Sequence, residues 1–432
     1  MKFLTFTLSL LLAASLQADP AITLETKGEC PVWINGTFVH NGLAKVSLSK
    51  QFAEELPSDP ALLHAFQIKD GKVIYNKKLL QTKESNPNAN INVAKFFDQY
   101  VALSERPLPV IFDIATLESK GLFDYQDTLP KKGIWESALP HCDPATEEVL
   151  NYFVEYGKES LYYIYRMTKG STKREPIAQL AVDEPSYMHS FAITPHYIIL
   201  SEFPFILQNY KEPKLSSYRW IEGRPLRILI VNRQTGKLIG QYKTEESVFA
   251  FHHINSYEKD HELVIDMAAY PDASCITNPQ GDDPDNKRVA RFTRYRVSLL
   301  THKVVKEQLG PAIEMPCINY ERSNGKPYEY VYGIDNSEPL DKAKRRDLVK
   351  IDTRTKKLTI WTENGCFASE PVFIAKPGAK NEDDGIILSI VLDTKQKRSF
   401  LLFVEADTFK EIGRAFIPHE IPLGLHGEFF RQ

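Results

Sequence analysis

The stretch Ile228-Leu-Ile-Val-Asn-Arg-Gln-Thr-Gly-Lys-Leu-Ile239 places two short apolar runs on either side of a polar turn. Asn, Thr and Gly between alternating apolar segments are typical of a β-hairpin. The same order of residue types recurs through the whole chain, at residues 66–75, 295–305, 348–360 and 400–412. Hairpins repeated from one end of a chain to the other favour radial repetition of small antiparallel sheets.

The fold expected from this pattern is an all-β β-propeller. A double-sheet sandwich is the structural alternative, because the repeat is too degenerate to give the number of blades. Irregular polar segments at 86–92, 278–285 and 340–347 are expected to be loops. The apolar spacing of residues 93–100 is that of a short amphipathic helix.

The N-terminus has the pattern of a secretory signal peptide. Met1 and Lys2 precede an apolar run from Phe3 to Leu12, and small residues up to Ala18 follow. The run is shorter than the roughly 20 apolar residues that a membrane-spanning helix needs. We therefore expect residues 1–18 to be a signal peptide, residues 19–432 to form one domain, and the protein to be exported, either periplasmic or secreted. An uncleaved N-terminal membrane anchor is the alternative.

Composition excludes several classes of function. The 432 residues include 53 basic and 56 acidic side chains, and a formal charge of -3 gives no field that would attract nucleic acid. The five cysteines show no zinc-ribbon spacing, and nucleotide-loop, zincin and serine-hydrolase motifs do not occur. Residues 340–347 contain a cluster of four basic side chains: Lys342, Lys344, Arg345 and Arg346. This cluster is a candidate for peripheral membrane contact.

Histidines in apolar, strand-like surroundings are the remaining candidates for chemistry. His189 lies in residues 187–195, His252 in residues 249–258, and His426 in residues 421–429. A single buried histidine is more often a hydrogen-bonded structural residue than a metal ligand. The functional interpretation therefore depends on the three segments taken together.

Together with other motifs, these segments resemble the carotenoid cleavage oxygenases, the family that also contains the retinoid isomerohydrolase of the visual cycle. The likeness extends over nearly the whole mature chain. Besides the three histidine segments, the matching motifs are, in chain order, Gly28-Glu-Cys-Pro-Val-Trp-Ile-Asn-Gly-Thr37, Leu63-His-Ala-Phe66, Asp143-Pro-Ala-Thr146, Glu314-Met-Pro-Cys-Ile-Asn319, Tyr328 to Gly333, and Ser369-Glu-Pro-Val-Phe373 with Glu382-Asp-Asp-Gly385.

The resemblance implies a seven-bladed β-propeller, with loop and short-helix insertions covering one face. It also implies a non-haem ferrous ion on the propeller axis, held by four imidazoles beneath an apolar tunnel. His189, His252 and His426 match three ligand positions, whereas Leu139 stands where the first ligand belongs. His141 is a tentative replacement. In an extended chain the two Cα atoms are roughly 6–7 Å apart, so His141 reaches the metal only if the backbone or the metal moves.

Three glutamates match the family's positions behind the ligands: Glu105, Glu314 and Glu370. A carboxylate that accepts the second ring N–H of a ligand fixes its tautomer and supplies negative charge. By analogy with the family, Glu105 pairs with His189, Glu370 with His252 and Glu314 with His426.

The implied function is oxidative cleavage, with Fe(2+) as cofactor and O2 as co-substrate, of an alkene in a carotenoid, apocarotenoid or related apolar polyene, giving aldehydes. Two alternatives stay open. The first is a metal-poor or metal-free propeller that binds an apolar ligand without catalysis, because Leu139 removes a ligand. The second is an isomerase or hydrolase of the same family.

Overall fold

The computed structural model describes residues 21–43, 60–81, 88–131, 134–157, 159–210, 214–279, 285–338 and 343–432. The expected signal peptide at 1–18 lies outside these residues. Within them, no helix has both the length and the apolar character needed to cross a membrane.

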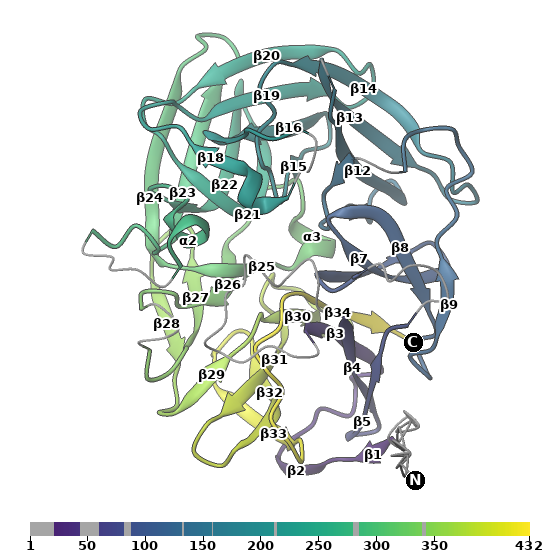
Figure 1. Ribbon diagram of the computed structural model, residues 1–432. Coiled ribbons are helices and arrows are strands. Elements are labelled where there is room, and N and C mark those ends of the chain that lie inside the picture. Colours follow the sequence, from purple (N-terminus) through teal and green to yellow (C-terminus); the bar gives the residue numbers. More distant parts are fainter. Residues whose placement is uncertain are drawn as a thin grey trace, which may run out of the picture.

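Seven antiparallel sheets arranged around one axis form a β-propeller (Figure 1). The expected fold class is confirmed, and the sandwich alternative is wrong. The first blade takes strands from both ends of the chain: β1 (Ile22–Thr23), β3 (Gly36–Leu43), β4 (Ala61–Lys69), β5 (Lys72–Leu79) and β34 (Gly427–Arg431).

The next three blades follow in chain order. They consist of β6 (Asn92–Phe96), β7 (Gln99–Ser104), β8 (Arg106–Phe112) and β9 (Ser119–Leu122); of β10 (Ile134–Glu136), β11 (His141–Asp143), β12 (Glu148–Glu155), β13 (Ser160–Met167) and β14 (Glu175–Val182); and of β15 (Ala192–Ile193), β16 (Tyr197–Glu202), β19 (Arg227–Asn232) and β20 (Leu238–Lys243). A separate two-stranded hairpin contains β17 (Phe205–Leu207) and β18 (Tyr218–Trp220).

The last three blades complete the ring. They consist of β21 (Phe249–Lys259), β22 (Glu262–Tyr270), β23 (Arg291–Ser298) and β24 (Val304–Ala312); of β25 (Glu314–Cys317), β26 (Tyr330–Ile334), β27 (Leu348–Asp352) and β28 (Leu358–Trp361); and of β2 (Glu25–Gly28), β29 (Cys366–Ala368), β30 (Val372–Ala375), β31 (Gly385–Asp393), β32 (Arg398–Glu405) and β33 (Glu411–Phe416).

Side-chain hydrogen bonds explain the repeated turn sequence. Asn232 Oδ1 accepts the backbone N–H groups of Gln234 and Thr235, and Asp352 Oδ1 accepts those of the residues two and three positions further on. Such bonds fold an Asn or Asp back onto its own turn. Because this chemistry is local, all five predicted hairpins occur, at 66–75, 228–239, 295–305, 348–360 and 400–412.

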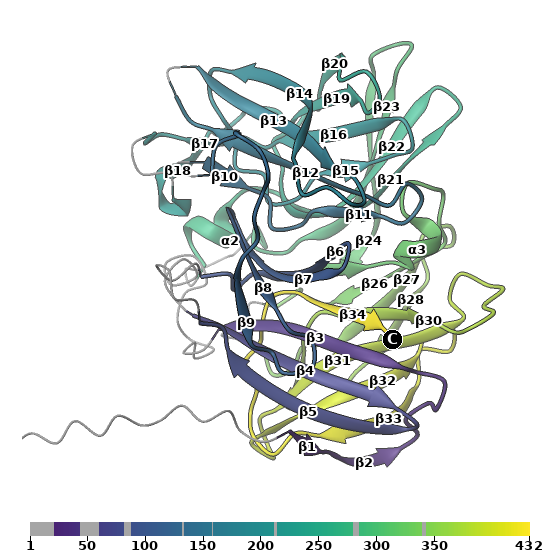
Figure 2. The same cartoon turned by 90° about the vertical axis from the view of Figure 1, so that its right-hand side faces the viewer.

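Strands from the two ends of the chain close the ring. The C-terminal β34 pairs with β3 from Gly36↔Arg431 to His40↔Gly427, and β2 pairs with β33. Figure 2 shows β1 and β2 at the edge of these two neighbouring blades. Closure of a ring in this way leaves no gap between its first and last blades.

The expected helix at residues 93–100 is wrong. These residues form the hairpin of β6 and β7, in which Asn92 pairs with Leu103 and Phe96 with Gln99. Phe97 turns the chain with a φ of 56°. The helical spacing of apolar residues is overridden because the ladder to β7 buries Val93 and Phe96 between blades.

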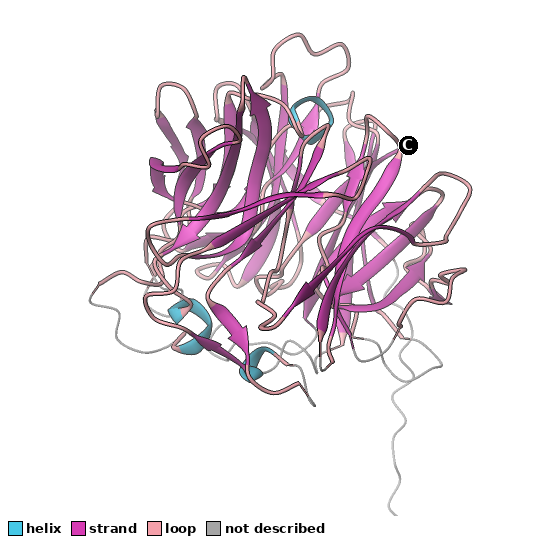
Figure 3. Cartoon of the chain, turned by 90° about the horizontal axis from the view of Figure 1, so that it is seen from above, coloured by secondary structure: helices cyan, strands magenta, loops and turns pink. Residues whose placement is uncertain are grey.

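Helices are few and short. The described residues contain η1 (Leu215–Ser217) and α2 (Ser274–Thr277) near the face where the inner strands begin, and α3 (Tyr320–Ser323) near the opposite face. Figure 3, which views the chain from another direction, shows helices at both faces of an otherwise β-rich molecule. The innermost strands surround the axis, one from each blade: β6, β11, β15, β21, β25, β30 and β34.

Candidate metal centre

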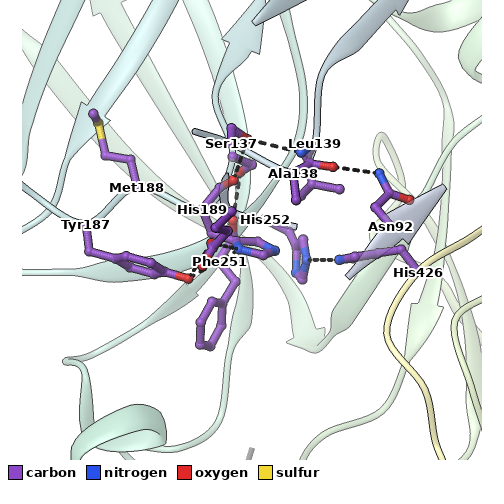
Figure 4. Close-up of polar contacts among 12 residues, drawn as sticks. Asn92, Ser137, Ala138, Leu139, Tyr187, Met188, His189, Phe251, His252 and His426 are labelled. Carbon is purple, nitrogen blue, oxygen red and sulfur yellow. Dashed lines mark hydrogen bonds and ion pairs between the residues drawn. The ribbon is translucent and has the colours of Figure 1, made fainter. Parts of the chain in front are cut away.

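Three histidines from three blades meet at the axis. One ligand nitrogen from each of His189, His252 and His426 lies within 4.8 Å of the others, and all three residues are buried. His189 precedes β15, His252 lies near the start of β21 and His426 directly precedes β34. The ring centroids are 5.1 to 5.9 Å apart, and Figure 4 shows the rings turned toward a common region.

A carboxylate holds the second nitrogen of each ring. The Nδ1 atoms of His189, His252 and His426 lie 2.7, 2.6 and 2.8 Å from oxygens of Glu105, Glu314 and Glu370, respectively. Nδ1 is therefore engaged by a carboxylate in each ring, and Nε2 is the atom left to face the axis. This is the arrangement that orients metal-binding imidazoles in proteins.

Two of the expected pairings are wrong. His252 pairs with Glu314 instead of Glu370, and His426 pairs with Glu370 instead of Glu314. The physical reason is adjacency. Strand β21 lies next to β25, which begins at Glu314, and β34 lies next to β30, which directly follows the Glu370 segment. Each of these two rings therefore meets the carboxylate of the neighbouring blade.

Further hydrogen bonds hold the carboxylates. Glu314 Oε2 also accepts the Met315 N–H, and Glu370 Oε2 accepts the Gly427 N–H. Glu105 Oε1 accepts the hydroxyl of Tyr187. These donors fix the carboxylate oxygens, so each imidazole is oriented by a group that is itself anchored.

The pKa shifts differ among the members of the cluster. Burial lowers the pKa of His252, but the charge and hydrogen bond of Glu314 outweigh it and leave that pKa above its ordinary value. Burial raises the pKa of Glu105 to about 8, against the opposing hydrogen bond from Tyr187. Burial and the neighbouring His252 and His426 hold the pKa of His189 well below its ordinary value. Neutral imidazole, which has a lone pair, is the form that binds metals. Three nitrogen donors backed by carboxylates fit a divalent transition metal such as ferrous iron.

Position 139 lies beside the cluster but offers no donor. Ser137 Oγ donates a hydrogen bond to the carbonyl of His189 and accepts the backbone N–H of Leu139 at 3.1 Å. Asn92 Nδ2 donates to the carbonyl of Ala138, which fixes the same segment from the other side (Figure 4). The backbone at the expected first ligand position is thus tied to His189, and its side chain is apolar.

His141 does not join the cluster, so the tentative assignment as a ligand does not fit the structure. Its Nδ1 lies 2.7 Å from the hydroxyl of Tyr320, and its Nε2 lies 3.0 Å from the carbonyl of Phe191. Both ring nitrogens are therefore engaged in hydrogen bonds within the protein. Strand β11 carries this ring away from the three other histidines, as its distance along an extended chain requires.

His253, the neighbour of a ligand candidate, has a structural role that its sequence context did not indicate. Its Nδ1 lies 2.8 Å from Ser190 Oγ and its Nε2 lies 2.8 Å from Ser201 Oγ. Ser190 Oγ also donates to the carbonyl of Phe251. His253 thereby ties the segment after His189 to the strand that carries His252. The sequence could have indicated this, because adjacent residues of a strand point to opposite sides and His252 and His253 therefore cannot both face the axis.

Comparisons with known proteins show which proteins the chain resembles. The profile of the family described as "Retinal pigment epithelial membrane protein" matches residues 13–431. A carotenoid isomerooxygenase of Galleria mellonella is 28% identical, with 93% of this chain and 92% of that protein covered. A β,β-carotene 15,15′-dioxygenase of Gallus gallus is also 28% identical, over 95% of this chain and 96% of that protein.

Solved structures have the same fold. An apocarotenoid oxygenase of Synechocystis, carrying a Glu-to-Gln substitution, superposes with a TM-score of 0.84. The alignment covers 96% of this chain and 97% of that one at 22% sequence identity. A cobalt-substituted form of the Synechocystis protein superposes equally well.

Proposed function

The chain belongs to the family of the retinal pigment epithelial membrane protein and the carotenoid oxygenases, and from that premise we propose that it is a ferrous dioxygenase. The proposed reaction cleaves one carbon–carbon double bond of a carotenoid, an apocarotenoid or a related conjugated alkene. Both atoms of dioxygen enter the products, one on each carbon of the broken bond, and two carbonyl compounds result.

One observation carries the proposal. Three buried imidazoles meet on the axis, and each is oriented from behind by an anchored carboxylate. Ferrous iron held by Nε2 of His189, His252 and His426 would supply the activation of dioxygen. Glu105, Glu314 and Glu370 bind the Nδ1 atoms and keep the rings in place. The chain's remaining contribution is to keep water from the alkene with apolar side chains.

The apolar surroundings of the cluster support an apolar substrate. The ring of Phe251 lies edge-on to His189 at 5.7 Å and contacts Phe249 and Tyr270 on its other sides. Phe251 is only half-buried, whereas Phe249 is fully buried. Aromatic faces beside the imidazoles are suited to contact the flat conjugated chain of a polyene.

The test is turnover with and without each co-reactant. The full chain is reconstituted with ferrous iron and incubated with β-carotene or an apocarotenal under air, under nitrogen and after iron removal. We expect aldehyde products only with both iron and oxygen, and labelled dioxygen should enter both carbonyl groups. Turnover without oxygen or iron would contradict the proposal and would favour isomerase or hydrolase chemistry.

A second candidate function follows from Leu139. An apolar residue lies where a fourth donor is expected, on a segment hydrogen-bonded to His189. Loss of a metal ligand at this position is expected in a propeller that binds an apolar ligand without catalysis. Iron analysis separates the two functions, because the binding protein would stay free of iron after ferrous reconstitution although it retains ligand.

We also propose that the protein is exported as a single domain after removal of residues 1–18. The support is the sequence pattern of Met1 to Ala18. N-terminal sequencing of protein recovered from the periplasm or the medium tests this. A mature N-terminus at Met1, or retention in the cytoplasm, would contradict it.

A further inference from the structure

The three ligand rings are not evenly spaced around the axis. The ring centroid of His252 lies 5.2 Å from that of His189 and 5.1 Å from that of His426, whereas the centroids of His189 and His426 are 5.9 Å apart. The blades of β6 and β11 lie between the blades of these two histidines, and none of their described residues joins the cluster. Leu139 lies on this side. Contacts within the protein therefore have to keep His189 and His426 in place here.

Ser137 connects this side of the cluster to His189. Its Oγ donates a hydrogen bond of 2.7 Å to the carbonyl of His189 and accepts the N–H of Leu139 at 3.1 Å. Its carbonyl in turn accepts a hydrogen bond of 2.9 Å from Nδ2 of Asn151, on β12. Ser137 is buried, so these bonds form in a medium of low dielectric constant, where they are stronger than in water. The backbone of one ligand residue is thus bonded to the segment 137–139.

Asn92, the first residue of β6, holds the same segment from the next blade. Its Nδ2 donates to the carbonyl of Ala138 at 2.9 Å, and its Oδ1 accepts the N–H of Val93 at 2.8 Å. Both ends of the amide are engaged, which fixes the orientation of the side chain. Figure 4 shows Ser137 and Asn92 on either side of Ala138. The segment 137–139 is therefore held from two directions.

Asn41, on β3, connects Asn92 to the last histidine. Its side chain is fully buried, and its Nδ2 donates to the carbonyls of Ala89 at 2.8 Å and of Asn92 at 2.9 Å. Between these two residues, the carbonyl of Ile91 accepts the N–H of His426 at 3.1 Å. The N–H of Asn41 donates to the carbonyl of His426 at 2.9 Å. Asn41 and the segment 89–92 thus hold both main-chain polar groups of His426.

These contacts form one continuous path between the two histidines. The path runs from the main chain of His189 through Ser137, Asn92 and Asn41 to the main chain of His426. We call Ser137, Asn92 and Asn41 the bridging network. The carboxylates behind the two rings fix Nδ1 of each ring. Because the main chain is held as well, Nε2 of each ring keeps its position before a metal binds.

We propose that the bridging network does the work of a fourth ligand in keeping His189 and His426 at metal-binding separation, so that Ser137 and Asn92 are positioning residues of the metal centre. This inference rests on the proposed function, because it concerns how the ferrous site is held. Ligands that are ordered before the metal arrives bind it more tightly, since less conformational entropy is lost on binding. Three histidines therefore suffice to retain the metal although Leu139 offers no donor.

Metal affinity tests the proposal independently of turnover. The metal-free full chain is titrated with Co2+ under nitrogen, because the visible absorption of bound cobalt reports both the occupancy of the site and the arrangement of its ligands. The variants are Ser137→Ala, which removes the bonds to His189 and Leu139, and Asn92→Leu, which removes the bond to Ala138. Denaturant unfolding of the metal-free variants measures their stability separately.

Two control variants remove equivalent hydrogen bonds elsewhere in the propeller. Asn319 is buried, and its Nδ2 donates one bond of 2.9 Å to the carbonyl of Glu382, so Asn319→Leu matches Asn92→Leu. Thr353 is also buried, and its hydroxyl donates one bond of 2.8 Å to the carbonyl of Tyr328. Thr353→Val therefore matches Ser137→Ala. Neither control residue belongs to the bridging network.

We expect Ser137→Ala and Asn92→Leu to lower cobalt affinity about tenfold or more and to change the cobalt spectrum at saturation. The two controls should stay within about twofold of the wild type, with an unchanged spectrum, at a similar loss of stability. Equal affinities in site variants and controls would overturn the proposal. If one site variant fails to fold, the other carries the test. Metal binding that depends on the network in a chain that cleaves no alkene would refute the dioxygenase function and leave the network standing.

Discussion

The Nδ1 atom of His252 lies 2.6 Å from the carboxylate of Glu314, which comes from the next blade of the propeller. Strands β21 and β25 are neighbours around the axis, so this contact joins two blades at the metal centre. The same relation between adjacent blades links His426 to Glu370. These two His–Glu pairs therefore bond adjacent blades to each other at the axis.

We predict that Leu139→His increases iron binding. The backbone at 139 is already tied to His189 through Ser137, so an added imidazole starts close to the axis. Iron affinity should rise about tenfold or more, because each added ligand contributes to binding where the site is preformed. The measurement is iron stoichiometry after reconstitution and dialysis against a chelator.

Leu139→Phe is the control for this substitution, because it changes size without adding a donor. An equal iron content in the two variants would show that position 139 cannot reach the metal.

We predict that Glu314→Gln lowers iron affinity about 10–100-fold, the range typical of groups that orient metal ligands. The amide keeps the size of the side chain but removes the negative charge that Nδ1 of His252 faces. Glu307→Gln, at an exposed ion pair with Lys356, is the control. Unchanged affinity in Glu314→Gln would mean that this carboxylate does not support the site.

We predict that His141→Gln destabilises the fold and leaves iron content unchanged. The ring bonds the hydroxyl of Tyr320 and the carbonyl of Phe191, so its loss should cost about 1–3 kcal/mol of the free energy of unfolding. Denaturant unfolding and iron analysis on the same samples give both quantities. Loss of iron in this variant, comparable to that in His252→Gln, would restore His141 as a ligand.

We predict a pH-dependent contribution to stability from the buried pair of Arg174 and Asp127. The side chains are 0% and 3% exposed. Burial raises the pKa of Asp127, but the hydrogen bonds and charge of Arg174 outweigh it and leave the pKa below its ordinary value. The stabilisation is therefore complete above about pH 4, near the unfolded-state pKa, and is lost as the pH falls through the folded-state pKa.

Asp127→Asn tests this pair. At pH 7 it should cost about 3 kcal/mol, because it leaves a buried guanidinium without its partner charge. The difference from the wild type should narrow as the pH falls below 4. Unfolding of both metal-free proteins at pH 7, 4 and 3 provides the comparison, and a constant difference at all three values would contradict the prediction.

Hydrogen bonds within single turns made the hairpins predictable from the sequence. Assignments that depended on contacts between distant residues were wrong. The turn in which Asn232 accepts two following N–H groups forms from neighbouring residues, so its sequence alone predicts a hairpin. Residues 93–100 carry the spacing of a helix, and only the pairing of Asn92 with Leu103 makes them a strand. That pairing depends on burial between blades, which the spacing of one segment does not report.

The amino-acid sequence by itself determined the family resemblance, the propeller, the three histidines and the three glutamates. Those features follow from residue types in order along the chain. Only the tertiary structure decided which glutamate faces which histidine, that His141 bonds Tyr320 instead of reaching the axis, and that His253 bonds Ser190 and Ser201. Each of these contacts depends on which blades are neighbours and on how their strands are aligned. Contacts between residues far apart in the sequence are fixed only when the ring of blades closes.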